Sequence, residues 1–155
     1  YRQASYFSNG EMGKMNCLIT IHDYHDVQGQ HEKSELTTTA EIHGTPDDYF
    51  IIYEEQSDEL KGCTTTVHVE DSTRVTVSRE GAYNTELKME KNKRNLCCYN
   101  TPVGQIMMGV HTSSIRSEYT ENKKTVLDFS YSLDFNNELL SKNRIKITAK
   151  YEEVS

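Results

Sequence analysis

The run His22-Asp23-Tyr24-His25-Asp26 is the densest group of side chains in the sequence that could bind a metal. Zinc needs three or four such ligands converging on one point. On a β-strand, residues three apart face opposite sides, so His22 and His25 diverge, while Asp23 and His25 share a face. Because two ligands do not make a site, we predict no metal here, and we expect no cofactor.

Patterns that would indicate catalysis are weak. Glu54 and Glu55 are neighbours, so a strand would send them to opposite faces, whereas the paired carboxylates of glycoside hydrolysis must flank one bond. Gly104 and Gly109 lie in a β context, without the following helix of a phosphate-binding loop. Three further histidines are scattered, which favours solvent or barrel-wall positions: His43, His68 and His111. We therefore name no catalytic residue.

Two charged residues share a strand face with apolar ones. Arg79 lies on the same side of its strand as two valines, and Asp23 on the same side as two isoleucines: Val75 and Val77, Ile19 and Ile21. If the apolar side chains face the interior, the charges do too, and a buried charge must find a partner or reach water. We expect an inward Arg79 to pair with Asp23 or Glu55.

Arg79 has two interpretations. An arginine at a strand end can extend to the rim of a barrel, and strand ends depart from strict alternation. Alternatively, its guanidinium group anchors an anionic ligand inside the barrel, because its fork of donors suits a carboxylate. On the second interpretation the candidate ligand-binding residues are Arg79, Asp23, Glu55, Tyr53 and Thr65.

The elements that must position these residues are β-strands. Thr occurs 16 times, Val 9, Ile 9 and Tyr 10, against 4 Ala, and branched or aromatic side chains suit a pleated surface better than a helix. Alternation in 125–135 and 144–151 separates a buried face from a wet one, which is typical of antiparallel sheet. The expected fold is all-β, a single closed antiparallel up-and-down barrel of about 8–10 strands.

The expected strands are 15–27, 36–43, 49–56, 63–70, 73–79, 84–90, 94–100, 105–119, 125–135 and 144–151. Residues 44–47 (Gly-Thr-Pro-Asp) predict a turn. The polar stretches 28–35 and 136–143 are expected to be loops, with room for one helical turn in 136–142. Residues 1–14 show no period and are interpreted as a flexible leader, a cloning remnant or an upstream start, which leaves 15–155 as a single barrel domain.

Charge and cysteine content restrict the partners and the compartment. The net charge of −7 repels phosphate backbones, so we expect no nucleic acid partner, and the basic groups near Lys91 and Lys123 are interpreted as solvated hairpin tips. No apolar run approaches the ~18 residues of a membrane span. Without a secretion signal, the four cysteines are expected to be reduced thiols in the cytoplasm.

Several segments also resemble a known family. They are Tyr-Glu-Glu at 53–55, Thr-Thr-Thr at 64–66, VTVSREG at 75–81, YNTPVGQIMMGVHT at 99–112 and LDFSYSLDFNNEL at 127–139. In order and content, these resemble the YwiB-like bacterial family of unknown function, whose members look like lipocalin or calycin barrels. The resemblance covers about 15–151 and implies a small cytoplasmic barrel in a Gram-positive-type bacterium. It implies no activity, and the sequence has no Trp, so the Gly-x-Trp signature of lipocalins is missing.

These observations predict a non-catalytic barrel that binds a small, partly apolar or anionic molecule, as a monomer or homodimer. The alternative is a filled barrel that acts as a protein-interaction or structural module, and an enzyme ranks third. An interior cavity favours the first function and a packed interior the second. An enzyme would need a cleft that holds an acid and a base together.

Overall fold

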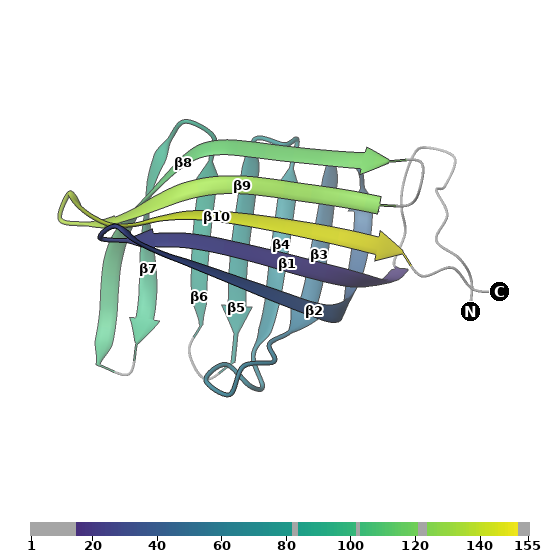
Figure 1. Cartoon of the computed structure of the whole chain (residues 1–155), viewed down its shortest axis with the longest axis horizontal. Helices are drawn as coiled ribbons and strands as arrows, with labels where there is room; N and C mark the ends of the chain where they lie inside the picture. Colours follow the sequence, from purple (N-terminus) through teal and green to yellow (C-terminus); the bar gives the residue numbers. More distant parts are fainter. Residues whose placement is uncertain (1–14, 82–83, 102, 121–123, 152–155) are drawn as a thin grey trace.

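The chain folds into one antiparallel sheet that curls into a nearly closed barrel (Figure 1). The computed structural model describes residues 15–81, 84–101, 103–120 and 124–151, so the predicted leader 1–14 lies outside the described residues. The described chain contains ten strands and no helix: β1 (Met15–Val27), β2 (Gln30–Thr45), β3 (Asp48–Glu54), β4 (Thr64–Glu70), β5 (Arg74–Glu80), β6 (Thr85–Glu90), β7 (Arg94–Thr101), β8 (Gly104–Thr120), β9 (Lys124–Phe135) and β10 (Glu138–Tyr151). The predicted all-β barrel is confirmed.

The strand order is β6-β5-β4-β3-β2-β1-β10-β9-β8-β7, so the two ends of the sheet are β6 and β7. These two strands lie beside each other, and side chains of β7 bridge the seam between them. Asn95 Nδ2 donates to the Lys88 carbonyl (3.1 Å), Asn100 Nδ2 donates to the Asn84 carbonyl (2.6 Å), and the Lys88 N–H donates to Cys97 Sγ (3.4 Å). Because these bonds use backbone groups at the edge of β6, the seam is closed without a regular ladder.

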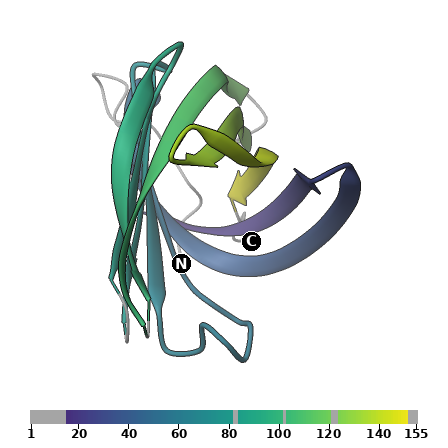
Figure 2. The same cartoon turned by 90° about the vertical axis from the view of Figure 1, so that its left-hand side faces the viewer.

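Two predicted loops are strands. Residues 30–35 belong to β2 and residues 138–143 to β10, so the loop predictions for 28–35 and 136–143 and the helical turn at 136–142 are wrong. The hairpins turn tightly at Gln28-Gly29 (φ 52° and 83°) and Asn136-Asn137 (φ 50° and 66°), conformations suited to two-residue hairpin turns. Their arms extend beyond the apolar core, which explains why their sequences are polar. The β1–β2 hairpin curls away from the rest of the barrel in Figure 2.

One part of the barrel is filled with side chains. Inward residues of β3 to β6 form three cross-strand rows, and the first is fully buried: Tyr49, Val69, Val75 and Met89. The second row is also apolar: Ile51, Val67, Val77 and Leu87. The third row is polar: Tyr53, Thr65, Arg79 and Thr85. The predicted alternation therefore continues along each strand while the chemistry of its inward face changes.

Among the described residues, no helix is long and apolar enough to cross a membrane.

Candidate ligand site in the barrel

A cavity of about 460 Å³ lies inside the barrel beside the polar row. Its apolar lining includes Leu36, Val77, Phe129 and Ile147, which come from four different strands. Its polar lining gathers charged groups and phenols: Asp23, Glu55, Arg79, Tyr53, Tyr99 and Tyr131. A volume of this size with a few convergent polar groups is typical of small-molecule sites.

Arg79 points inward and pairs with Glu55. Arg79 Nη2 lies 3.4 Å from Glu55 Oε2, and the two side chains are 28% and 10% exposed. Glu55 follows β3 and keeps the parity of Tyr53, so its carboxylate enters the cavity from the start of the β3–β4 loop. Thr65, opposite both Tyr53 and Arg79 in the ladders, donates from Oγ1 to the same Glu55 oxygen (2.5 Å). Arg79 Nε is buried and, within the described part of the chain, has no hydrogen-bond partner.

Three tyrosines surround this pair with protonated hydroxyls. Burial raises the pKa of Tyr53, Tyr99 and Tyr131 above the ordinary value, and the positive charge of Arg79 opposes the shift in each case. All three phenols therefore stay neutral at physiological pH and can donate hydrogen bonds to a bound molecule.

Asp23 lines the same cavity, and its carboxylate is held by a neighbouring histidine. His25 Nδ1 lies 3.3 Å from Asp23 Oδ1, and His25 Nε2 lies 3.0 Å from Glu32 Oε2. The hydrogen bonds with Asp23 and Glu32 raise the pKa of His25. As strand parity predicted, His22 faces away from His25, and it lies 3.6 Å from Glu35.

The structure brings the predicted site residues together. Asp23, Tyr53, Glu55 and Arg79 line one cavity, and Thr65 is bonded to Glu55 at its edge. Their role in ligand binding stays a prediction. Sequence reasoning missed Tyr99 and Tyr131. Tyr131 alternates with Ser130 and Ser132 in a recognised strand and could have been found by parity, whereas the position of Tyr99 depends on how β7 meets β6.

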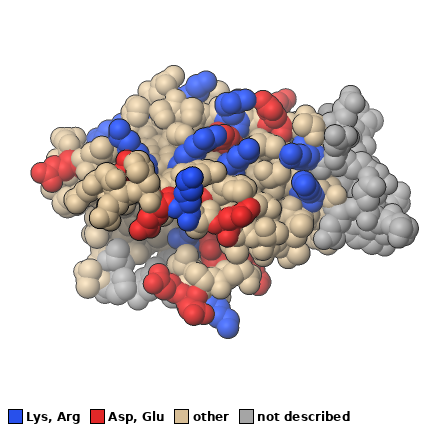
Figure 3. Space-filling model, viewed as in Figure 1, with Lys and Arg blue, Asp and Glu red and all other residues tan. Residues whose placement is uncertain are grey.

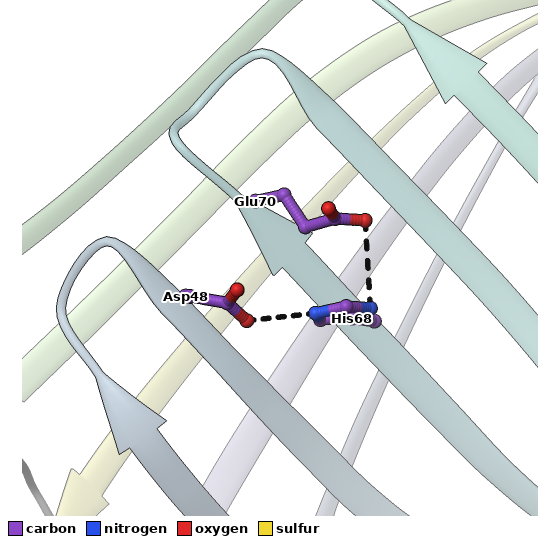
Figure 4. A group of neighbouring side chains, drawn as sticks. All are labelled: Asp48, His68 and Glu70. Carbon is purple, nitrogen blue, oxygen red and sulfur yellow. Dashed lines mark hydrogen bonds and ion pairs between the residues drawn. The ribbon is translucent and has the colours of Figure 1, made fainter.

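A second group of polar residues lies on the outer face of β3 and β4 (Figure 4). Among the described residues, Asp48, His68 and Glu70 bring potential metal ligands within 4.8 Å of one another. Asp48 Oδ1 contacts His68 Nε2 (2.8 Å), while Glu70 Oε1 faces His68 Nδ1 (3.6 Å). The two carboxylates thus occupy different edges of the imidazole, which suits a polar network around one ring better than a shared metal.

His43 and His68 occupy barrel-wall positions, one of the two kinds of position expected for them, and they are neighbours in space. Both rings stack on Phe50, with centroids 5.0 and 3.9 Å away. The pairing of β2, β3 and β4 places these three residues opposite one another, and only the strand register reveals this neighbourhood.

The comparisons with known proteins agree with the fold. The crystal structure of the ywiB protein from Bacillus subtilis is similar over 94% of this chain and 97% of that chain, with a TM-score of 0.78 and 21% identity. At that identity the likeness shows the fold alone. No curated protein matches the chain. The family model described as Domain of unknown function (DUF1934) matches residues 19–147. Because this match covers most of the sequence, the chain belongs to the DUF1934 family.

Proposed function

We propose that the barrel binds a small, partly apolar molecule with an anionic head group in its cavity, without catalysing a reaction. The observation that supports this most directly is the inward guanidinium group of Arg79. Its Nε has no hydrogen-bond partner among the described residues, and its Nη2 makes a long contact of 3.4 Å with Glu55. Buried donors left without acceptors are costly, so a ligand that supplies acceptor atoms would be stabilised there.

The lining of the cavity matches such a molecule in two parts. Near Arg79, the guanidinium group and the hydroxyls of Tyr53, Tyr99 and Tyr131 supply donors for a carboxylate or similar head. Farther along, Val77, Phe129 and other apolar residues offer a surface for a hydrocarbon tail. The combination favours an amphiphile over a fully polar ion.

Glu55 is expected to weaken the binding of an anion. It already occupies one edge of Arg79 and adds a negative charge, so an anionic head must displace or tolerate it. Asp23 adds a second carboxylate to the cavity. Replacing Glu55 with glutamine removes the competing charge at nearly constant size, and this change separates an anionic ligand from a cationic one.

The test uses octanoate, octanol and octylammonium, which differ only in the head group. Isothermal titration calorimetry should show octanoate binding most tightly. Arg79→Gln should weaken octanoate binding about tenfold or more, the value of a charge-assisted hydrogen bond, and Glu55→Gln should strengthen it. Arg74→Gln removes the same charge from the outer face of the same strand and should have no effect. The proposal would be overturned if octylammonium bound most tightly of the three, or if none of the three bound.

The alternative, a protein-interaction module, is favoured by a different feature. Large apolar side chains are exposed near the tips of the β1–β2 and β9–β10 hairpins: Val27, Phe135, Leu139 and Leu140. Native mass spectrometry of the protein purified from its host distinguishes the two functions. A retained small molecule supports ligand binding, and a retained protein partner supports the interaction module.

A further inference from the structure

The outer face of β10 carries a row of cations, and acidic residues of the neighbouring strands, such as Asp128 and Asp26, lie among them. β10 alternates apolar inward residues with an outward row of Lys142, Arg144, Lys146 and Lys150. β2 adds Lys33, and β8 adds Arg116. Figure 3 shows Lys and Arg side chains over β8, β9 and β10, with Asp and Glu side chains lying among them. In a protein with a net charge of −7, a cation of this row that lacks a carboxylate partner is therefore the point at which an anion would be attracted.

A groove of about 650 Å³ lies beside this row of cations. Two neighbouring cross-strand rows form most of its lining, to which Glu32 and Tyr131 are added. The first row consists of Lys33, Tyr24, Arg144 and Ser130, and the second of His31, Asp26, Lys142, Ser132 and His111. Because these residues lie on five adjacent strands, the groove is built on the sheet and not on loops.

The charges within the groove differ in their availability. Arg144 donates from Nε and Nη2 to both carboxylate oxygens of Asp128 (3.0 and 2.7 Å), so its fork is occupied. Asp26 accepts a hydrogen bond from the Gly29 N–H (2.8 Å). In contrast, Lys142 has no carboxylate within 4 Å in the described part of the chain. Its ammonium group is therefore available to a ligand.

The wall of the groove includes an aromatic ring. Lys33 and Arg144 lie over the ring of Tyr24, with the charged groups 5.9 and 5.8 Å from its centroid. These contacts hold the Tyr24 ring and the alkyl chains of the two cations together as a partly apolar surface. This surface lies in the row next to Lys142 and Ser132.

We propose that the groove binds a small phosphate ester that carries a ring, of the nucleoside diphosphate class. A phosphate group offers several acceptor oxygens, and Lys142, Ser132 and His111 supply separate donors in one row. A carboxylate would fit less well, because the arginine fork that would recognise it is held by Asp128. The Tyr24 surface accommodates the ring, and the volume exceeds that of phosphate alone.

The experiment titrates the full chain with ADP, pyrophosphate and adenosine at low ionic strength, by calorimetry. We expect ADP to bind, pyrophosphate to bind more weakly and adenosine not to bind detectably. Lys142→Gln should weaken ADP binding about tenfold, and Ser132→Ala should weaken it less. Lys150→Gln is the matched control, because it removes the same charge from the same face of β10 outside the groove.

Three results would overturn the proposal. They are the absence of ADP binding at millimolar concentration, equal affinity for pyrophosphate and ADP, and equal weakening by Lys142→Gln and Lys150→Gln, which would indicate diffuse attraction. Arg79→Gln changes the interior cavity and should leave ADP affinity within twofold. An equal loss in that variant would also contradict a separate site on the outer face.

Discussion

Replacing Arg79 with alanine measures what the pair inside the cavity contributes to folding. At 3.4 Å, opposite charges attract with a gross energy of about 5 kcal/mol at an effective dielectric constant of about 20. Desolvation of the two ions cancels much of this attraction. Glu55 would keep the hydrogen bond from Thr65, and water could enter the cavity beside it. We therefore expect a loss of about 1–3 kcal/mol, less than the ~3–5 kcal/mol of a sealed pair.

The control is Arg74→Ala on the same strand. Arg74 is 52% exposed and pairs with Glu70 at 2.9 Å, and such surface pairs contribute less than about 1 kcal/mol. Urea unfolding followed by far-UV circular dichroism gives both values, since the chain has no Trp for fluorescence. With a slope of about 1–3 kcal/mol per molar urea, Arg79→Ala should lower the midpoint by about 1 M. Arg74→Ala should change it by a small fraction of that amount.

Equal midpoints for the two variants would refute this reasoning, because Arg79 would then behave as a surface residue. A double-mutant cycle with Glu55→Gln identifies the source of any loss. If Arg79→Ala costs the same with and without the Glu55 charge, the loss comes from packing and the ion pair contributes nothing.

Three further measurements follow from the structure. Protein denatured without reductant should titrate with four thiols, and native protein should react first at half-buried Cys98; fewer than four thiols would contradict the predicted reduced state. The hydrogen bonds from Arg144 lower the pKa of Asp128. The stability that ionised Asp128 contributes to the fold is therefore present above about pH 4 and is lost as the pH falls through the lowered pKa. Asp128→Asn should therefore lower the urea midpoint at pH 7, and the midpoints of the variant and the wild type should become equal in acid. A difference between the two midpoints that does not change with pH would count against the ion pair. Burial raises the pKa of Tyr49 to about 12, so stability should decline above about pH 10 as unfolded phenols ionise, and Tyr49→Phe should lessen that decline.

Strand parity was sufficient to predict much of the interior. The inward positions of Asp23, Tyr53 and Arg79 follow from counting by twos along segments with a clear buried face, and the structure places them on one cavity. Glu55 was found by the same count, although it lies one residue beyond β3. Parity is local, so it needed no knowledge of the neighbouring strands.

The hairpin arms were not predicted as strands, because strand parity can be recognised only where one face is apolar and the other polar. Residues 30–35 and 138–143 are polar or exposed on both faces, so no period distinguishes a strand from a loop there. Their turn residues carried the better signal, since Gln28-Gly29 and Asn136-Asn137 adopt positive φ values typical of tight hairpins. The outer groups around His68 and Lys142 depend on register across several strands, which a single strand's sequence does not encode.

The barrel separates a packed apolar region from a polar cavity along the same four strands. The first and third inward rows of β3 to β6 lie four residues apart along each strand. On β4 the inward residue changes from Val69 to Thr65, and on β5 it changes from Val75 to Arg79. The first row is fully buried and supplies packing, while the third leaves an open volume beside charged groups. A polar row inside a barrel is destabilising unless its groups are satisfied, and Arg79 is satisfied only in part. The packed rows therefore support a polar lining that would be unstable alone, which is the arrangement that the proposed ligand site requires.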